Sequence, residues 1–192
     1  MKISLYAFLA CLILVSCKTK KPGPENNYVS ITSIISGQVA AVDTSLYSIK
    51  RLDIIDSSRT DTAFIHREQF RALARDFLEL PDIANKKNRD GFREETRFDD
   101  MMNTVVITYL PVNPSNSVIQ REEILISPNP AGDKIKSIIV DYLLNNRDSI
   151  VQKRMLWQVD RSFQVTTMKQ IAGQDETIRT TKVVWNEPEE NQ

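Results

Sequence analysis

The chain has 192 residues, of which 41% are hydrophobic and 26% are charged, so it is long enough to bury a sizeable core. Its 25 basic residues balance 25 acidic ones, and a chain without a basic excess lacks the electrostatic footprint of a nucleic-acid-binding protein. Two cysteines and one histidine leave few side chains for metal binding or for acid–base chemistry near neutral pH.

The first segment has the three parts of a secretory signal, in the usual order. Lys2 supplies a positive charge, an apolar run extends to Val15, and the small residue Ser16 precedes Cys17. A helix that spans a bilayer needs about 20 apolar residues, so a permanent transmembrane helix is the weaker interpretation. We therefore expect residues 1–16 to be a signal peptide that is removed.

The four residues Leu14-Val15-Ser16-Cys17 resemble the lipobox of bacterial lipoproteins. This resemblance implies that Cys17 is acylated, becomes the first residue after cleavage and anchors the protein in a membrane. The alternative is an ordinary secretory signal followed by a free thiol. Because Cys11 leaves with the signal, a lipoprotein would keep no thiol for a disulfide, a nucleophile or a metal site.

Residues 17–27 form a polar segment with prolines and lysines, which predicts a flexible tether behind the lipidated cysteine. Ten such residues reach at most about 33 Å, so the folded part would stay near its membrane. The lysines could rest on anionic head groups, although a solvated linker is the simpler interpretation. Lipoproteins of the Bacteroidota that reach the cell surface commonly carry acidic residues just after the cysteine. The basic segment here favours the periplasmic side of the outer membrane.

Residues 28–187 contain no further linker and no repeat of fixed period, so we expect one globular domain followed by a disordered tail at 188–192. Apolar residues between Ile31 and Leu46 step by three or four and predict a first helix. The cluster that ends at Ile55 could belong to a strand.

The clearest single element is the sequence HREQFRALARDFLELPD. Apolar residues from Phe70 to Leu78 recur at the helical period, and Pro81 ends the pattern. Such a stripe is more often part of a core than a groove for a partner, so this helix should cover a sheet.

After a loop at Asn85 to Asp90, the hydrophobic pattern has a period of two almost to the end of the chain. The connections between the apolar runs are too short for crossover helices, so neighbouring strands should be antiparallel. The expected fold is α+β, an antiparallel meander of about six strands with one or two helices packed on it and a curved half-barrel as one possible form. The six runs begin at Val105, Ile124, Ile135, Val151, Phe163 and Val183.

Both faces of the longest run require cover, because apolar residues lie on each of them. We expect the helix around Phe70 to cover one face. The other could be covered by the first helix, by curvature of the sheet, by a partner or by an apolar ligand. One face carries Ile138, Val140, Tyr142 and Leu144, and the other carries Ile135, Ile139 and Leu143.

The sequence offers little catalytic chemistry. His66 has no paired nucleophile and lies where the helix should begin, which favours a helix-start or surface role. Asp99-Asp100 and Glu122-Glu123 could ligate a cation, but adjacent residues of a strand point to opposite faces. Solvated positions or charges that protect a strand edge are the simpler interpretation. We expect no enzyme activity and no cofactor besides the lipid on Cys17.

Two functions from different classes remain. The first is a non-catalytic interaction or assembly subunit of the cell envelope, anchored in the outer membrane and docked to another envelope protein. The second is a carrier that holds a lipid or another apolar ligand in a curved sheet. A flat exposed sheet edge over a filled core would favour the subunit, which needs only the anchor and the sheet. A cavity lined by the following residues would favour the carrier: Tyr142, Met155, Trp157, Phe163 and Val183.

Overall fold

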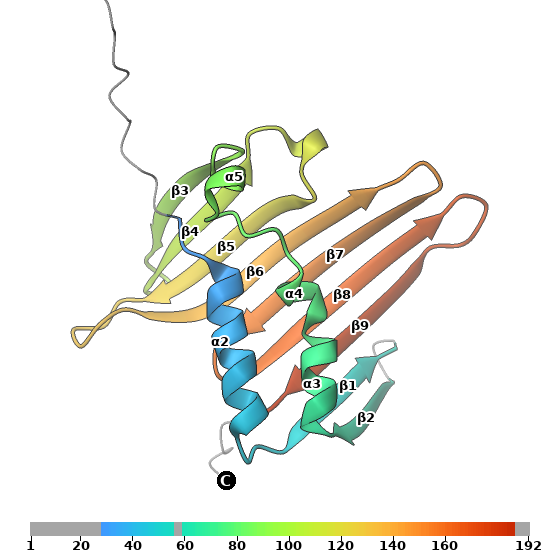
Figure 1. Ribbon diagram of the computed structural model, residues 1–192, viewed down its shortest axis with the longest axis horizontal. Helices are drawn as coiled ribbons and strands as arrows, with labels where there is room; N and C mark the ends of the chain where they lie inside the picture. The colour runs from blue at the N-terminus through green and yellow to red at the C-terminus, as the bar shows by residue number, and fades with distance from the viewer. Residues whose placement is uncertain (1–27, 56–58, 187–192) are drawn as a thin grey trace, which may run out of the picture.

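The structure is a computed structural model that describes residues 28–55 and 59–186 (Figure 1). The predicted signal peptide, Cys17, the tether and the C-terminal tail lie outside the described residues. The first half of the chain forms α2 (Ile31–Thr44), β1 (Ile49–Ile54), β2 (Thr60–Ile65), α3 (Arg67–Leu73), α4 (Arg75–Leu78) and α5 (Lys86–Arg89). The second half forms β3 (Phe92–Asp99), β4 (Thr104–Pro111), the 3-10 helix η2 (Pro114–Asn116), β5 (Ile119–Ser127), β6 (Lys134–Asn145), β7 (Ser149–Gln158), β8 (Ser162–Ile171) and β9 (Thr177–Val184).

The nine strands of the described residues join one antiparallel sheet in the order β2-β1-β9-β8-β7-β6-β5-β4-β3. The strands from β3 to β9 form a continuous meander, and β1 pairs with the last strand, β9, on one side and with β2 on the other. The α+β class and the antiparallel pairing are confirmed. The expected number of six strands is too low, because β1, β2 and β3 extend the sheet, and the sheet stays open rather than closing into a barrel.

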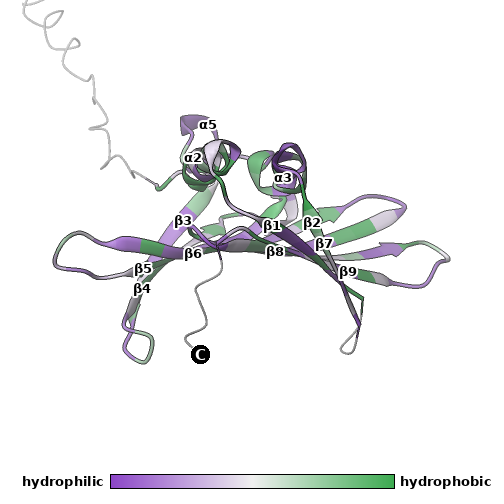
Figure 2. Ribbon diagram, turned by 90° about the horizontal axis from the view of Figure 1, so that it is seen from below, coloured by the Kyte–Doolittle hydropathy of each residue, from purple (hydrophilic) through white to green (hydrophobic). Residues whose placement is uncertain are grey.

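The helices α2 and α3–α4 lie side by side on the same face of the sheet (Figure 2). Helix α2 has a buried stripe at the helical period, and the Ser30 side chain caps its start by accepting a hydrogen bond from the Ser33 N–H at 3.2 Å. The predicted helix around Phe70 divides at Ala74 into α3 and α4. Of the covers that the sequence left open for the second face of the sheet, the first helix is excluded, because α2 shares one face with α3–α4.

Gln38 ties α2 to the sheet through its side-chain oxygen. This oxygen accepts a hydrogen bond from the Trp157 indole N–H at 2.6 Å and another from the Asp160 backbone N–H at 3.2 Å. Because Trp157 is fully buried, Gln38 supplies the partner that the indole would otherwise lack. The contact fixes α2 over the turn between β7 and β8.

The face of the sheet without helices carries charged and apolar side chains in alternation along the strands. Arg121 donates to Asp141 at 2.7 Å and lies 3.5 Å from Glu123, and these three side chains join β5 to β6. Ile139 and Leu143 are half-buried on this face. Ile135 packs instead against the core, because an irregularity in the pairing of β5 with β6 shifts the alternation, so the sequence placed Ile135 on the wrong face.

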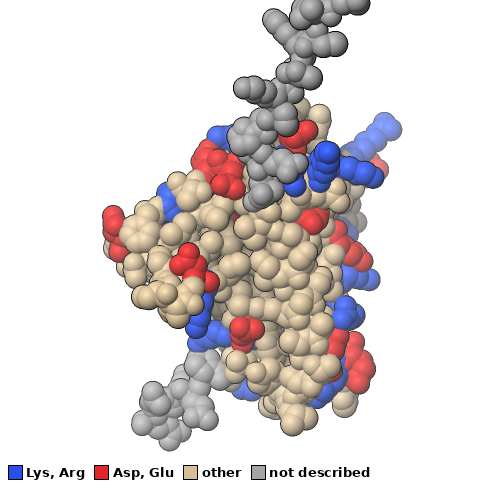
Figure 3. Space-filling view, turned by 60° about the vertical axis from the view of Figure 1, so that its left-hand side comes forward, with Lys and Arg blue, Asp and Glu red and all other residues tan. Residues whose placement is uncertain are grey.

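On the face seen in Figure 3, acidic and basic side chains lie next to one another, mainly around the margin of a broad uncharged area. Within the described segments, no helix combines the length and the apolar character that crossing a bilayer requires.

Candidate functional site

The five residues proposed for an apolar cavity lie on the helix-covered face of the sheet. Met155, Trp157, Phe163 and Val183 are at most 1% exposed, and Tyr142 is half-buried beside them. The Tyr142 ring lies 5.7 Å from the Lys153 ammonium, which is held at 2.7 Å by Asp76 of α4. The sheet thus brings these side chains together as the sequence predicts.

Aromatic side chains from the helices occupy the space above these residues. Phe70 and Phe77 pack edge-on against Trp157 with ring centroids 6.5 and 5.2 Å away. Trp157 stacks on Phe163 at 5.2 Å, and Trp185 lies 5.4 Å from Trp157. This part of the molecule is therefore a packed aromatic core, whose ring pairs stabilise the attachment of α3–α4 to the sheet.

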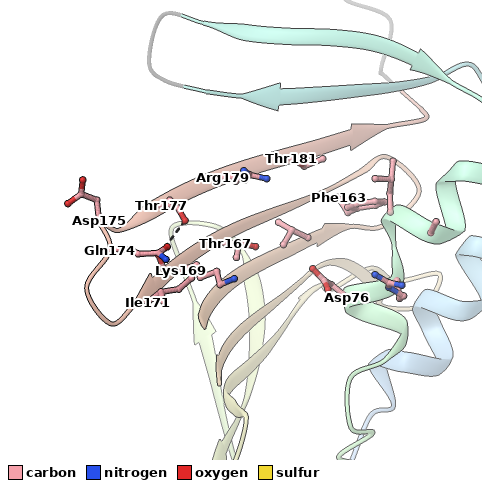
Figure 4. Close-up of a pocket in the computed structure, with 14 residues that line it drawn as sticks. Asp76, Phe163, Thr167, Lys169, Ile171, Gln174, Asp175, Thr177, Arg179 and Thr181 are labelled. Atoms are coloured by element: carbon pink, nitrogen blue, oxygen red, sulfur yellow. Dashed lines mark hydrogen bonds between the residues drawn. The ribbon is translucent and has the colours of Figure 1, made fainter. Parts of the chain in front are cut away.

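A groove opens where the sheet extends beyond α3–α4 (Figure 4). Its volume is about 550 Å³. One wall comes from the helices, and the floor and the other wall come from β8, β9 and the turn between them. The residues that line it are Ala72, Leu73, Arg75, Asp76, Phe163, Val165, Thr167, Lys169, Ile171, Gln174, Asp175, Thr177, Arg179 and Thr181.

This groove has an apolar inner end and a basic outer end. Phe163 and Val165 are buried, with 1% and 8% of their surface exposed, whereas Lys169 and Arg179 are exposed. Only Phe163 of the groove lining was among the site residues that the sequence predicted. The cations were missed because β8 and β9 first had to be paired in register before Lys169 and Arg179 could be placed together.

Glu122 is the second unusual feature. It is fully buried on the helix-covered face, opposite Tyr109 of β4 and Val140 of β6. Neither carboxyl oxygen has a hydrogen-bond partner among the described residues. Burial, and to a smaller extent the negative charge of Asp82, raise the pKa of Glu122 to about 8. The group is therefore protonated at neutral pH.

Two groups near Glu122, the Tyr109 hydroxyl and the Asp82 carboxylate, are hydrogen-bonded to residues that precede α2. The Tyr109 hydroxyl accepts a hydrogen bond from the Val29 N–H at 3.1 Å, and Asp82 accepts one from the Ser30 hydroxyl at 3.0 Å. Burial also raises the pKa of the Tyr109 phenol. Glu122 thus lies among groups that fix the entry of the chain into α2.

The remaining sequence candidates are dispersed. Glu122 and Glu123 point to opposite faces as predicted, but the expectation of a solvated position is wrong for Glu122. Asp99 caps the turn after β3 by accepting from the Met102 N–H at 3.0 Å, which lowers the pKa of Asp99. His66 is exposed at the start of α3, where its backbone N–H donates to the Gln69 side chain at 3.3 Å. Across residues 28–55 and 59–186, no group of three or more metal-ligating side chains is placed to hold an ion.

The two edges of the described sheet differ in charge. The edge strand β3 carries Arg93, Glu94, Glu95, Arg97 and Asp99. The other edge strand, β2, has Asp61 as its only charged residue and presents Phe64 with 70% of its surface exposed.

Comparison of the chain with protein-family models, with curated proteins and with solved structures gives no match.

Proposed function

We propose that the protein is a lipid-anchored lipoprotein of the outer membrane that faces the periplasm and acts as a non-catalytic interaction or assembly subunit. The anchor rests on the resemblance of Leu14-Val15-Ser16-Cys17 to a lipobox. Two or three acyl chains on Cys17 would hold the chain to the membrane almost permanently. The single structural observation that supports docking is the sparsely charged edge strand β2.

An edge strand offers unpaired backbone N–H and C=O groups to any extended chain that comes beside it. Charges are one of the devices that prevent such pairing, and β3 carries five of them while β2 carries one. Phe64 adds an exposed aromatic ring that a partner side chain can cover. The proposed partner is another envelope protein that contributes an extended segment as a tenth strand beside β2.

The alternative function, a carrier with an apolar ligand inside the sheet, requires space above Trp157 and Phe163. That space is occupied by Phe70 and Phe77. The packed core therefore favours the subunit over a carrier of this design.

The anchor is tested with Cys17→Ser in the full chain. We expect the wild type in the outer-membrane fraction with an acylated N-terminus, and the variant in the soluble periplasmic fraction. An unmodified N-terminus on the mature wild-type protein, measured by mass spectrometry, would refute the lipoprotein assignment.

Docking is tested with a photo-crosslinking amino acid at position 62 of β2 in cells. We expect one dominant cross-linked partner that disappears with Phe64→Lys, because this change places a charge on the edge. Ile178→Lys is the matched control, since Ile178 is 57% exposed but belongs to β9, inside the sheet. Cross-linking that survives Phe64→Lys, or that never occurs at position 62, would exclude β2 as the docking edge.

A further inference from the structure

The groove beside α3–α4 has the dimensions of a small-molecule site. Its volume of about 550 Å³ falls within the range of roughly 300–1,000 Å³ that ligand pockets usually have. Its walls come from helices, strands and the short β8–β9 turn, so most of the side chains that line it are held by packed elements rather than by long loops.

Lys169 and Arg179 stand on the same face of neighbouring strands within this groove. Lys169 pairs with Thr177, and Thr167 pairs with Arg179, which places the two cations on a diagonal of the β8–β9 ladder. Side chains in this relation lie roughly 7–8 Å apart at their bases, close enough for both to reach one acidic group. Thr167, directly opposite Arg179 on β8, also lines the groove and adds a hydroxyl donor.

Neither cation makes an ion pair with another described residue, whereas six other basic side chains of the sheet do. These six are Arg51, Arg93, Arg97, Arg121, Lys153 and Arg154, each within 4.0 Å of a carboxylate. The two acidic residues of the groove do not neutralise the pair. Asp76 binds Lys153 at 2.7 Å, and Asp175 points away from Arg179 at the end of the β8–β9 turn (Figure 4).

The apolar end of the groove lies next to these cations. Phe163 and Val165 form its floor, and Leu73 of α3 belongs to the facing wall. A ligand that filled the groove would therefore place an acidic group at the two cations and an uncharged, apolar part over Phe163.

We infer that this groove binds a small organic anion, in which a phosphate or carboxylate group contacts Lys169 and Arg179 while an apolar part packs on Phe163. Charge-assisted hydrogen bonds to a guanidinium and an ammonium are roughly twice as strong as neutral ones, so the two cations carry the affinity. The acidic group can belong to a soluble metabolite or to a lipid headgroup. The inference is independent of docking at β2.

The test uses the full-length lipidated protein in a neutral detergent and follows its tryptophan fluorescence. Trp157 stacks on Phe163 of the groove floor, and Trp185 contacts Trp157, so both tryptophans lie near the site. We expect saturable binding of phenyl phosphate, weaker binding of inorganic phosphate and no response to the uncharged phenyl glucoside. Lys169→Gln and Arg179→Gln should each weaken phenyl phosphate binding about tenfold or more.

Lys182→Gln is the matched control, because Lys182 belongs to the same strand as Arg179 but to the opposite face. It removes the same charge and should leave the affinity unchanged. Equal weakening by all three variants, or absence of saturable binding, would overturn the inference. Equal affinity for inorganic phosphate would overturn its apolar half. Dihexanoyl phosphatidic acid separates the sources: tighter binding than phenyl phosphate assigns the anion to a lipid, and weaker binding assigns it to a soluble metabolite.

Discussion

The carboxyl group of Glu122 is buried and has no hydrogen-bond partner among the described residues. Desolvation of the ionised form without such a partner is energetically unfavourable. Its ordinary pKa of 4.5 is raised to about 8 in the fold. Between these pH values the folded chain keeps a proton that the unfolded chain has lost. The free energy of unfolding is therefore highest, as far as this group is concerned, below pH 4.5. It decreases as the pH rises from there towards 8.

We predict that Glu122→Gln removes this dependence on pH. Wild-type stability should fall by about 1.4 kcal/mol for each pH unit between about pH 5 and 8, whereas the variant lacks that slope and is the more stable protein at pH 8.5. Urea unfolding at several pH values measures both slopes. Glu123→Gln, on the other face of β5, is the control and should keep the wild-type slope. Parallel curves for the wild type and Glu122→Gln would show that Glu122 is ionised in the folded protein.

The Gln38 side chain is the acceptor for a buried indole. Gln38→Leu removes the acceptor of the buried Trp157 indole N–H, so we expect a loss of about 1–3 kcal/mol in the free energy of unfolding. Gln170→Leu changes an exposed glutamine and should alter stability by less than about 0.5 kcal/mol. Chemical denaturation compares the two. Similar small effects would mean that another group satisfies the indole.

Substitution of two exposed glycines by alanine should change the stability of the protein in opposite directions. Gly37 lies inside α2 with open space around its Cα, so Gly37→Ala should stabilise the protein by about 0.5–1 kcal/mol. Gly173 has a φ of 75° in the β8–β9 turn, a conformation that costs a residue with a Cβ about 1–2 kcal/mol. Thermal unfolding of both variants checks the signs, and stabilisation by Gly173→Ala would contradict the backbone argument.

The sequence predicted the elements whose apolar residues follow a period and missed two strands in which almost no residue is buried. Helix α2 and the strands from β4 to β9 have strong patterns and were expected. Strand β3 was not predicted because five of the eight residues of FREETRFD are charged. Strand β2 was not predicted because all its residues except Ile65 are exposed. Neither segment has a buried apolar face that a hydrophobic period could reveal, since each lies at an edge of the sheet.

The candidate sites were harder to predict because they depend on pairing between strands. Adjacent glutamates in QREEIL carry no sign of which one the sheet buries. The burial of Glu122 depends on the pairing of β5 with β4 and β6, which places Glu122 opposite Tyr109 and Val140 on the helix-covered face. Prediction of the groove would have required knowledge of the register of β8 with β9 and of the position where α4 ends. Neither is encoded in the local pattern of polar and apolar residues.

At the scale of the whole molecule, the pairing of β1 with β9 joins the beginning and the end of the described chain in one sheet. The helices pack on that same sheet through one continuous cluster of buried side chains. We therefore predict a single cooperative unfolding transition, in which tryptophan fluorescence and far-ultraviolet circular dichroism coincide.

Hydrogen exchange gives the independent check on this prediction. Amides shared by β1 and β9 should exchange with the same free energy as those between β6 and β7, because all of them open only with the whole sheet. Earlier exchange of the β1–β9 amides would show that the β1–β2 hairpin unfolds as a separate unit.

During synthesis, β1 can pair with β9 only after the ribosome has made nearly the whole described chain. Asp53 and its hydrogen-bond partner Thr181 are 128 residues apart in the chain. At roughly 5–20 residues per second, a ribosome needs roughly 6–26 s to deliver Thr181 after Asp53. During that interval the β1–β2 hairpin cannot pair with β9, so the sheet of the nascent chain stays incomplete. The chain remains accessible to proteins that bind unfolded polypeptides.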